Sequence, residues 1–405
     1  MALLDIIFIP LIFYAGHLIV DKVVVSYNIA SHRALLIRLF YYHILFSLIF
    51  ALYVTIYGGD SRGYWNYPER FLAVDGSWIQ LHQTGTRFIY FLTYPFAQVL
   101  GISYLAGTLL FSLFGFAGFI FIYLTMMKFM TVNPEMFGVK LIPLALFFPN
   151  MHFWSGGVGK DSIMFFATCL FIFSLTNPAK NIPGIIISFY LAYFIRPHIA
   201  LLMLVGFGFG LLLSTKGVSF FLRIVFLCSS LYIFFLISGT VFEFIGVEEN
   251  LESFEDISTI RSKNLSRGNV GSGIDISNYS VPMKIGTFLF RPLFFDAGNL
   301  FGIIVSLENL VYVLMGLSLL RFKNLIEILR MPLHLKAALA VLGSAVFFMS
   351  SSLSNLGIII RQKNMVMFMF VLIVLHLLGK RQEQDANIAA GKRARIRPEA
   401  NAQTA

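Results

Sequence analysis

Long apolar runs, separated by short polar segments, make up most of the chain. A helix needs roughly 17–25 apolar residues to cross about 30 Å of hydrocarbon, and many of the runs approach this length. Helices are the expected spans because backbone groups inside a bilayer must find their hydrogen bonds within the segment. The pattern therefore predicts an all-α, polytopic integral membrane protein.

The positions of the runs predict about eleven transmembrane helices within one polytopic domain, residues 1–380. The expected spans are 6–20, 39–57, 103–127, 141–154, 162–175, 184–195, 199–213, 218–237, 301–320, 341–352 and 366–378. The apolar stretch 87–101 is expected to lie along the membrane surface, because only then do the span counts from the two ends agree. Residues 58–101, 239–300 and 353–363 are then loops on one face, which we take as the outer face.

Composition and charge agree with a membrane protein. The chain is 58% hydrophobic and only 12% charged, whereas a soluble domain carries about 25% charged residues. The net charge is +10, and basic residues cluster in residues 381–405, which we expect to form a disordered cytoplasmic tail, because Lys and Arg are retained on that side. This explanation predicts no nucleic-acid partner. The two cysteines form no disulfide framework or metal motif, and no metal or cofactor is predicted.

The most unusual segment is 148–162, where three glycines, Lys160 and Asp161 interrupt two apolar runs. An isolated charge in hydrocarbon costs about 2.5–3.5 kcal/mol on insertion scales, so such charges usually mark a water-facing site. The glycines resemble a phosphate loop, but their spacing does not fit GxxxxGK[ST]. We therefore interpret the segment as one wall of a polar site on the outer face.

Further cations lie on the same predicted face, against the rule that outer loops are poor in Lys and Arg. They are Lys160, Arg196, His198, Arg261, Lys263, Arg267, Arg291, Arg361 and Lys363. An anionic partner would explain them, since the planar fork of arginine binds phosphate bidentately and stays charged. Snorkelling towards lipid headgroups is the alternative explanation for any one of them.

Carboxylates at two predicted helix ends supply the other half of a catalytic site. Asp60 follows the second span, and Asp161 follows Lys160. A glycosyl transfer needs a carboxylate near the acceptor hydroxyl and cations on the leaving phosphate. The alternatives are a turn residue for Asp60, and a helix cap or an ion pair with Lys160 for Asp161. Tyr64 and Trp65 would either stack on a sugar or belong to the interfacial aromatic belt.

Four short motifs together resemble those of the polytopic polysaccharide polymerases of bacterial envelopes, the Wzy-like and EpsG-like repeat-unit polymerases. The motifs are WSGGVGKD at 154–161, RPH at 196–198, FRPL at 290–293 and NLGIIIRQK at 355–363. The first outer loop, GGDSRGYW at 58–65, is similar to the acidic first outer loop of the GT-C membrane glycosyltransferases. That loop often carries two adjacent acids, whereas Ser61 follows Asp60 here.

The resemblance implies a GT-C-like fold and a metal-independent glycosyl transfer on the outer face of a bacterial plasma (inner) membrane. The donor would be an undecaprenyl-diphosphate-linked oligosaccharide, and the partners would be polysaccharide chain-length and export proteins. By motif position, Asp60 resembles the GT-C loop acid, and Arg196, Arg291 and Arg361 resemble the polymerase arginines. With the reasoning from the residues themselves, the predicted catalytic residues are Asp60, Asp161 and His198, and the predicted diphosphate- or glycan-binding residues are Lys160, Arg196, Arg291, Arg361, Lys363, Tyr64 and Trp65. His198, which follows a proline at a helix start, also has a structural explanation.

Three alternatives stay open. An O-antigen ligase shares the same general plan. A transporter or flippase for lipid-linked glycans would need charges deep in the spans and a broken-helix repeat, whereas the predicted spans are nearly free of charge and no repeat is evident. A scaffold subunit of an envelope assembly would tolerate any substitution of Asp60.

Overall fold

The computed structural model describes residues 3–66, 77–130, 132–213, 219–245, 273, 274, 276, 278–320 and 325–402. Over this part the chain is almost entirely helical, which confirms the all-α prediction. The strands found there are β1 Glu135–Met136 and β2 Val139–Lys140, which form one antiparallel hairpin. Large parts of the predicted outer loop 239–300 lie outside the described residues.

Six helical segments of the described chain are long and apolar enough to cross a membrane. They belong to α1 Asp5–Tyr27, α2 Arg33–Tyr57 with the preceding turn Ala30–His32, α6 Tyr104–Phe129, α15 Leu300–Leu319, α17 Leu333–Ser352 and α18 Leu356–Ala402. Their number indicates a multi-pass membrane protein. The bundle also contains α9 Lys160–Ser174, α10 Ile182–Ile195, α11 Pro197–Leu213, α12 Phe220–Ile245 and α14 Val281–Phe290.

The predicted span 141–154 is not one continuous helix. It is divided into α7 Leu141–Leu146 and α8 Pro149–Ser155, with Phe148 in an extended conformation between them. Pro149 explains the break, because proline lacks a backbone N–H and disfavours a helical conformation in the residue before it. Proline is well suited to the first turn of a new helix, which is its position in α8.

Two predicted non-helical segments prove to be helical. The outer loop 353–363 is a helix from Leu356 onwards, so Arg361 and Lys363 both lie on α18. The predicted disordered tail is also wrong for residues 381–402, which continue α18. Charge alone led to that prediction, but the segment is rich in Ala, Arg, Gln and Glu, which are strong helix formers.

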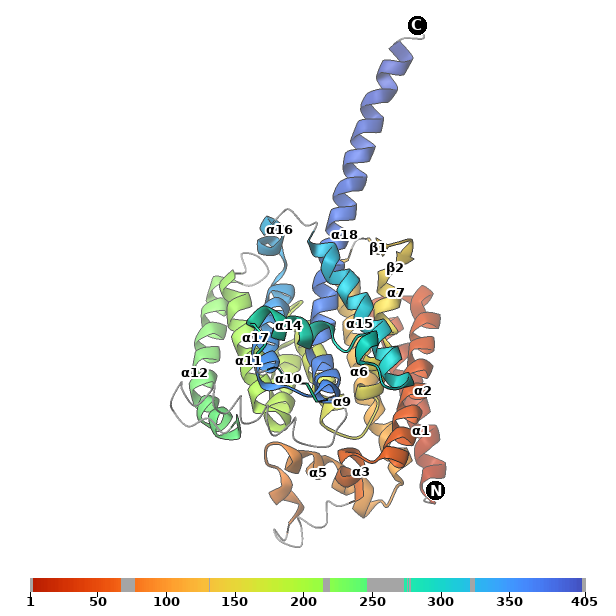
Figure 1. Ribbon diagram of the computed structural model, residues 1–405, viewed down its shortest axis with the longest axis vertical. Coiled ribbons are helices and arrows are strands. Elements are labelled where there is room, and N and C mark those ends of the chain that lie inside the picture. The colour runs from red at the N-terminus through yellow and green to blue at the C-terminus, as the bar shows by residue number, and fades with distance from the viewer. Residues whose placement is uncertain are drawn as a thin grey trace.

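The helices form a bundle with two distinct ends (Figure 1). The α3–α5 end carries α3 Asp60–Asn66, the turn Trp78–Leu81 and α5 Thr86–Tyr94, which continues into a π-helical turn at Pro95–Val99. The opposite end, here called the tail end, carries β1–β2, α16 Leu325–Arg330 and the projecting part of α18. The stretch 87–101 is not among the candidate spans and lies with α3 at the end of the bundle, as predicted for a non-crossing segment.

Small residues allow α6 to approach its neighbours closely. A Cβ atom added at Gly115 would lie 2.2 Å from the Ser155 carbonyl oxygen of α8 and 2.8 Å from His43 Nε2 of α2. One turn further along, Phe119 stacks on His152 with ring centroids 3.8 Å apart. Gly115 therefore sets how near α8 comes to α6, and with it the position of the turn that follows α8.

We expect Gly115→Ala to destabilise the protein by about 1–3 kcal/mol, because the new methyl group meets backbone that cannot move aside cheaply. Gly208→Ala on α11 is the matched control, since a Cβ there has no neighbour within 4 Å. Thermal unfolding in one detergent should show a lower midpoint for Gly115→Ala alone. Equal midpoints for the two variants would contradict this account of the packing.

Candidate functional site

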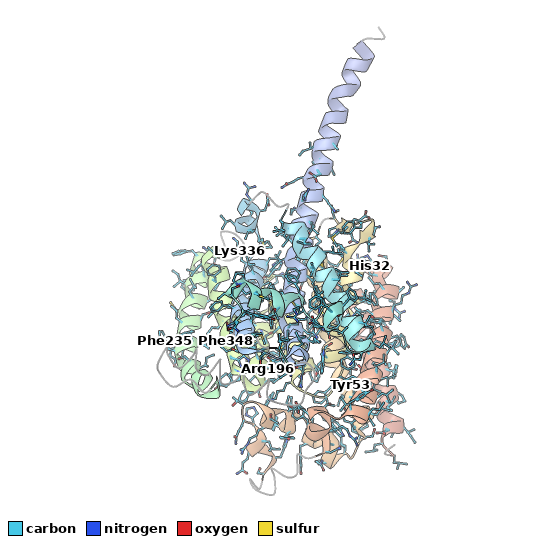
Figure 2. All side chains as sticks on the ribbon, viewed as in Figure 1. His32, Tyr53, Arg196, Phe235, Lys336 and Phe348 are labelled. Carbon is cyan, nitrogen blue, oxygen red and sulfur yellow. The ribbon has the colours of Figure 1, made fainter. Side chains whose placement is uncertain are left out.

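Four charged side chains from distant parts of the sequence meet at the α3–α5 end of the bundle. Asp60 begins α3, Asp161 lies in the first turn of α9, Arg361 lies near the start of α18, and Arg196 separates α10 from α11. Figure 2 labels Arg196 towards this end, together with Tyr53 of α2, whose side chain lines the same site. The group thus ties together four separate parts of the chain.

Glycine turns place the two carboxylates. Gly58 and Gly59 have φ values of +80° and +141°, which L side chains rarely adopt, and they redirect the chain from α2 into α3. Gly159, with φ of +152°, precedes α9 in the same way. A Cβ at Gly157 would lie 2.0 Å from Phe50 Cε1, so the turn between α8 and α9 is pressed against α2.

Asp161 lies between two arginines. Its Oδ1 accepts a hydrogen bond from Arg196 Nη2 at 2.9 Å, and its Oδ2 accepts one from Arg361 Nε at 2.5 Å. The side chains of Asp161 and Arg196 are only 10% and 9% exposed. Each oxygen of this buried carboxylate is therefore held by a different guanidinium group.

Asp60 is the outermost member of the group. Its Oδ2 accepts a hydrogen bond from Arg361 Nη1 at 3.3 Å, and its side chain is 63% exposed. The Arg361 guanidinium carbon also lies 5.6 Å from the centre of the Trp154 ring. The charges thus form a chain, Arg196–Asp161–Arg361–Asp60, that runs from the buried interior to solvent.

A cavity of about 200 Å³ opens beside this chain of charges. Its lining includes Tyr53, Asp60, Trp154, Gly157, Asp161 and Arg361. Two carboxylates, one guanidinium, aromatic rings and glycine backbone therefore border one space. Such a mixed wall, with a few convergent polar groups, is typical of sites that bind small polar ligands.

Burial shapes the electrostatics of the site. It raises the pKa of Tyr64 to about 12, with the charge of Asp60 acting in the same direction, so the phenol stays neutral. Burial, and then the charge of Arg196, lowers the pKa of Lys160. In the part of the chain that the structure describes, no carboxylate lies within 4 Å of the Lys160 ammonium group. Three cations face two carboxylates here, which favours an anionic ligand.

The structure brings together five of the predicted site residues, namely Asp60, Lys160, Asp161, Arg196 and Arg361. Tyr64 lies beneath them, 7% exposed, with its ring against Gly159. The prediction that Trp65 contacts a sugar or the interfacial belt is wrong. Trp65 is 3% exposed, donates to the Ile102 carbonyl at 3.2 Å and packs against Gly107, because α3 turns that side chain towards α6.

Three other predicted residues lie away from the cavity lining. His198 is half-buried on α11, where its ring lies 6.1 Å from that of Phe348. Arg291 forms a two-point ion pair with Asp296, with N–O distances of 2.5 and 3.0 Å. Lys363 is fully buried and donates to Asn309 Oδ1 at 2.5 Å and to the Arg291 carbonyl at 3.3 Å. Each is engaged by its own neighbours.

A buried polar network next to Lys363 was missed by sequence reasoning. Glu308, 4% exposed, accepts hydrogen bonds from Tyr312 at 2.7 Å and from the Asn150 amide at 2.8 Å. Asn150 also donates to Asn364 Oδ1 at 3.0 Å. The predicted span 301–320 thus carries one buried acid, Glu308, although the spans were expected to be nearly free of charge. The spacing of Glu308 and Tyr312, four residues apart on one helical face, was the available signal.

Within the described ranges, no group of three or more His, Cys, Asp or Glu side chains could hold a metal ion. A scan of protein-family models, a search of curated proteins and a search of solved structures each found no match.

We expect Asp161→Ala to destabilise the protein by about 3 kcal/mol or more, because it leaves the buried Arg196 without its partner. Asp21→Ala is the matched control: it removes an equally short ion pair with Arg33, at 2.8 Å, whose side chains are about half exposed. Its cost should be much smaller, because an ion pair in water contributes little to stability. Denaturant or thermal unfolding of both variants measures the difference, and similar costs would show that burial does not matter here.

Proposed function

We propose that the protein is a membrane glycosyltransferase that extends a surface polysaccharide on the outer face of a bacterial plasma membrane. The donor is an oligosaccharide carried on undecaprenyl diphosphate. The observation that carries the proposal is the exposed Asp60 carboxylate, paired with Arg361 at the edge of a cavity and backed by Asp161 and Arg196. The fold is proposed to be GT-C-like, with about eleven spans.

The reaction requires a base at one side of the cavity and positive charge at the other. An acceptor hydroxyl attacks the anomeric carbon, a new C–O bond forms, and the bond from that carbon to the lipid diphosphate breaks. The hydroxyl proton passes to a carboxylate, and the electron pair of the broken bond leaves with the diphosphate. Fixed cations aimed at the leaving group lower the barrier because they need not reorganise during the reaction.

Asp60 suits the role of base better than Asp161 does. Its side chain is 63% exposed, and its Oδ1 accepts no hydrogen bond from the described residues. Both oxygens of Asp161 already accept hydrogen bonds from guanidinium groups, and its side chain is only 10% exposed. Asp161 is therefore proposed as a positioning residue that fixes the two arginines.

Arg361 and Lys160 are proposed to bind the diphosphate. Arg361 lines the cavity, and its Nη2 forms no hydrogen bond to the described residues. Lys160 opens α9 next to Asp161 and is only partly buried. Arg196 lies deeper and acts through Asp161 rather than on the ligand.

The proposed orientation places the α3–α5 end outside the cell and the tail end in the cytoplasm. It is supported by the basic residues of α16 and α18 and by the β1–β2 hairpin with Lys140, which all lie at the tail end (Figure 1). Lys and Arg near the ends of spans are retained on the cytoplasmic side. The candidate site then faces the compartment where lipid-linked glycans are polymerised.

A transporter or flippase for lipid-linked glycans is the second candidate, favoured by the buried charges of Glu308 and Lys363. Ionisable residues inside spans often mark transport pathways. Here, however, the Glu308 carboxylate accepts hydrogen bonds from Tyr312 and the Asn150 backbone amide. The Lys363 ammonium group donates to Asn309 and to a backbone carbonyl. These saturated contacts fit a structural role better than a moving ion pair.

The proposal is tested on a gel of surface polysaccharide from a strain that lacks the gene. We expect the deletion to reduce the polymer ladder to a single repeat unit, and wild type but not Asp60→Asn to restore it. The control is Asp21→Asn, which should restore the ladder. It alters an exposed carboxylate towards the C-terminal end of α1. Normal membrane levels of each variant must be confirmed by immunoblot.

The other outcomes separate the alternatives. Full-length polymer that never reaches its final anchor would identify a ligase. An accumulation of unextended repeat units on the cytoplasmic side of the membrane would identify a flippase. A normal ladder in the deletion strain, or in Asp60→Asn, would overturn the assignment of Asp60 as the base.

We expect Arg361→Lys to lower the rate of chain extension by at least about tenfold while the protein still folds. A lysine keeps the charge, but its ammonium group cannot donate to both Asp161 and Asp60 and also lie over the Trp154 ring. The control is Arg33→Lys, because Arg33 lies in an exposed ion pair. Lys363→Arg would not serve, because Lys363 is fully buried. Chain extension by membranes containing each variant measures the effect, and a wild-type rate for Arg361→Lys would show that its fork geometry is not needed.

A further inference from the structure

A second and larger cavity lies at the tail end of the bundle. Its volume is about 1130 Å³, and it is bordered by the ends of α6 and α9, by α16 and α17, and by α18 where that helix leaves the bundle. Figure 2 labels Lys336, one of its lining residues, towards the tail end and Arg196 towards the opposite end. The tail-end cavity is therefore separate from the candidate transfer site.

Positive charge predominates in the lining of the tail-end cavity. Four cations, Lys128, Arg330, Lys336 and Lys380, face two carboxylates, Glu327 and Glu383. The two carboxylates are already used, because Glu327 pairs with Arg330 at 3.5 Å and Glu383 pairs with Lys380 at 2.8 Å. Lys128 and Lys336 are therefore not paired with either carboxylate of the lining.

The partners of both remaining ammonium groups among the described residues are uncharged, and Lys128 Nζ also lies 4.5 Å from the centre of the Phe173 ring. Lys128 Nζ donates to Thr176 Oγ1 at 2.9 Å, and Lys336 Nζ donates to the Leu213 carbonyl at 2.6 Å. Over the described ranges, neither has a carboxylate within 4 Å. Lys336 is only 5% exposed, so its charge is screened little by solvent. An anion in the cavity would meet two cations that are not neutralised.

His334 provides an independent sign of a missing ligand. It lines the cavity, is 5% exposed, and its Nε2 has no hydrogen-bond partner among the described residues. Its ring lies 5.1 Å from that of Phe129, and the ring of His376 lies 5.5 Å from the same phenylalanine. A buried polar atom without a partner costs free energy, which a hydrogen-bonding ligand would recover.

We propose that the tail-end cavity binds a ligand through an anionic phosphate group, contacted by Lys128, Lys336 and His334. Lysine is a common phosphate ligand, and hydrogen bonds between charged partners are the stronger kind. The apolar part of the lining, with Phe129, Leu329 and Met331, suits the acyl chains that adjoin the phosphate of a phospholipid. A free phosphate ion would use the same cations. The proposal does not depend on the transferase activity.

The test uses the full-length protein, purified in a neutral detergent, with thermal unfolding as the readout. Phosphatidylglycerol, phosphatidylcholine and inorganic phosphate are added separately at constant ionic strength. We expect an added anion that binds the cavity to raise the unfolding midpoint by at least about 2 °C, because it binds the folded state only. A shift with phosphatidylglycerol alone identifies a lipid headgroup, and a shift with inorganic phosphate identifies a soluble anion.

Variants locate the binding. Lys128→Gln keeps a donor for Thr176 but loses the charge, and we expect it and His334→Gln to weaken binding by about tenfold. Lys128→Arg should bind as the wild type does, and so should Lys140→Gln, an exposed residue of β2 at the same end but outside the cavity. If His334→Gln does not fold, the comparison of Lys128→Gln with Lys128→Arg decides alone.

Two results would overturn the proposal. One is the absence of any midpoint shift with phosphatidylglycerol and with inorganic phosphate. The other is a shift that is the same in Lys128→Gln as in Lys140→Gln, which would place the binding elsewhere on the basic end. A shift with phosphatidylcholine equal to that with phosphatidylglycerol would show a general lipid effect and would count against it as well.

Discussion

The site depends on one buried carboxylate that two arginines share. Removing three charges from water is costly, and it is tolerated only where each charge has a well-placed partner. Asp161 meets this condition because its two oxygens accept from Arg196 and Arg361 separately. The bond to each arginine joins α9 to a different part of the bundle. Asp161 therefore positions both arginines and, through Arg361, the exposed Asp60 as well.

Asp161 can occupy this position only because α8 is fixed at both of its ends. At its start, the Asn150 amide donates to Glu308 of α15, and the Asn150 side chain bonds Asn364 of α18. At its end, Gly157 fits against Phe50 of α2, where no side chain could be accommodated without a shift. The buried network of Glu308 is thus connected to the site by the short helix α8, although it contributes no residue to the cavity lining.

The sequence was sufficient to predict the all-α class and several charged residues of the site, but not every helix, nor which side chains face the site. Charges beside glycines at the ends of apolar runs identified Asp60 and Asp161, and its place at a predicted helix end identified Arg361. Lys363 was grouped with Arg361 because both seemed to lie in a loop. On a helix, two residues that are two positions apart point about 200° away from each other, so Lys363 faces the interior. The prediction for Trp65 was wrong for a similar reason. The direction of its side chain is set by the packing of α3 on α6, which is a long-range contact.

In the proposed reaction, the position of Arg361 between two carboxylates couples proton transfer to departure of the leaving group. When the acceptor proton moves to Asp60, that carboxylate becomes neutral and attracts Arg361 less strongly. The Nη1 group is then free to interact with the negative charge that develops on the diphosphate at the same moment. Asp161 holds the guanidinium in place through Nε, so the arginine need not move. The two carboxylates thus differ in access: Asp60 is 63% exposed and open to the acceptor, whereas both oxygens of the buried Asp161 already accept from arginines.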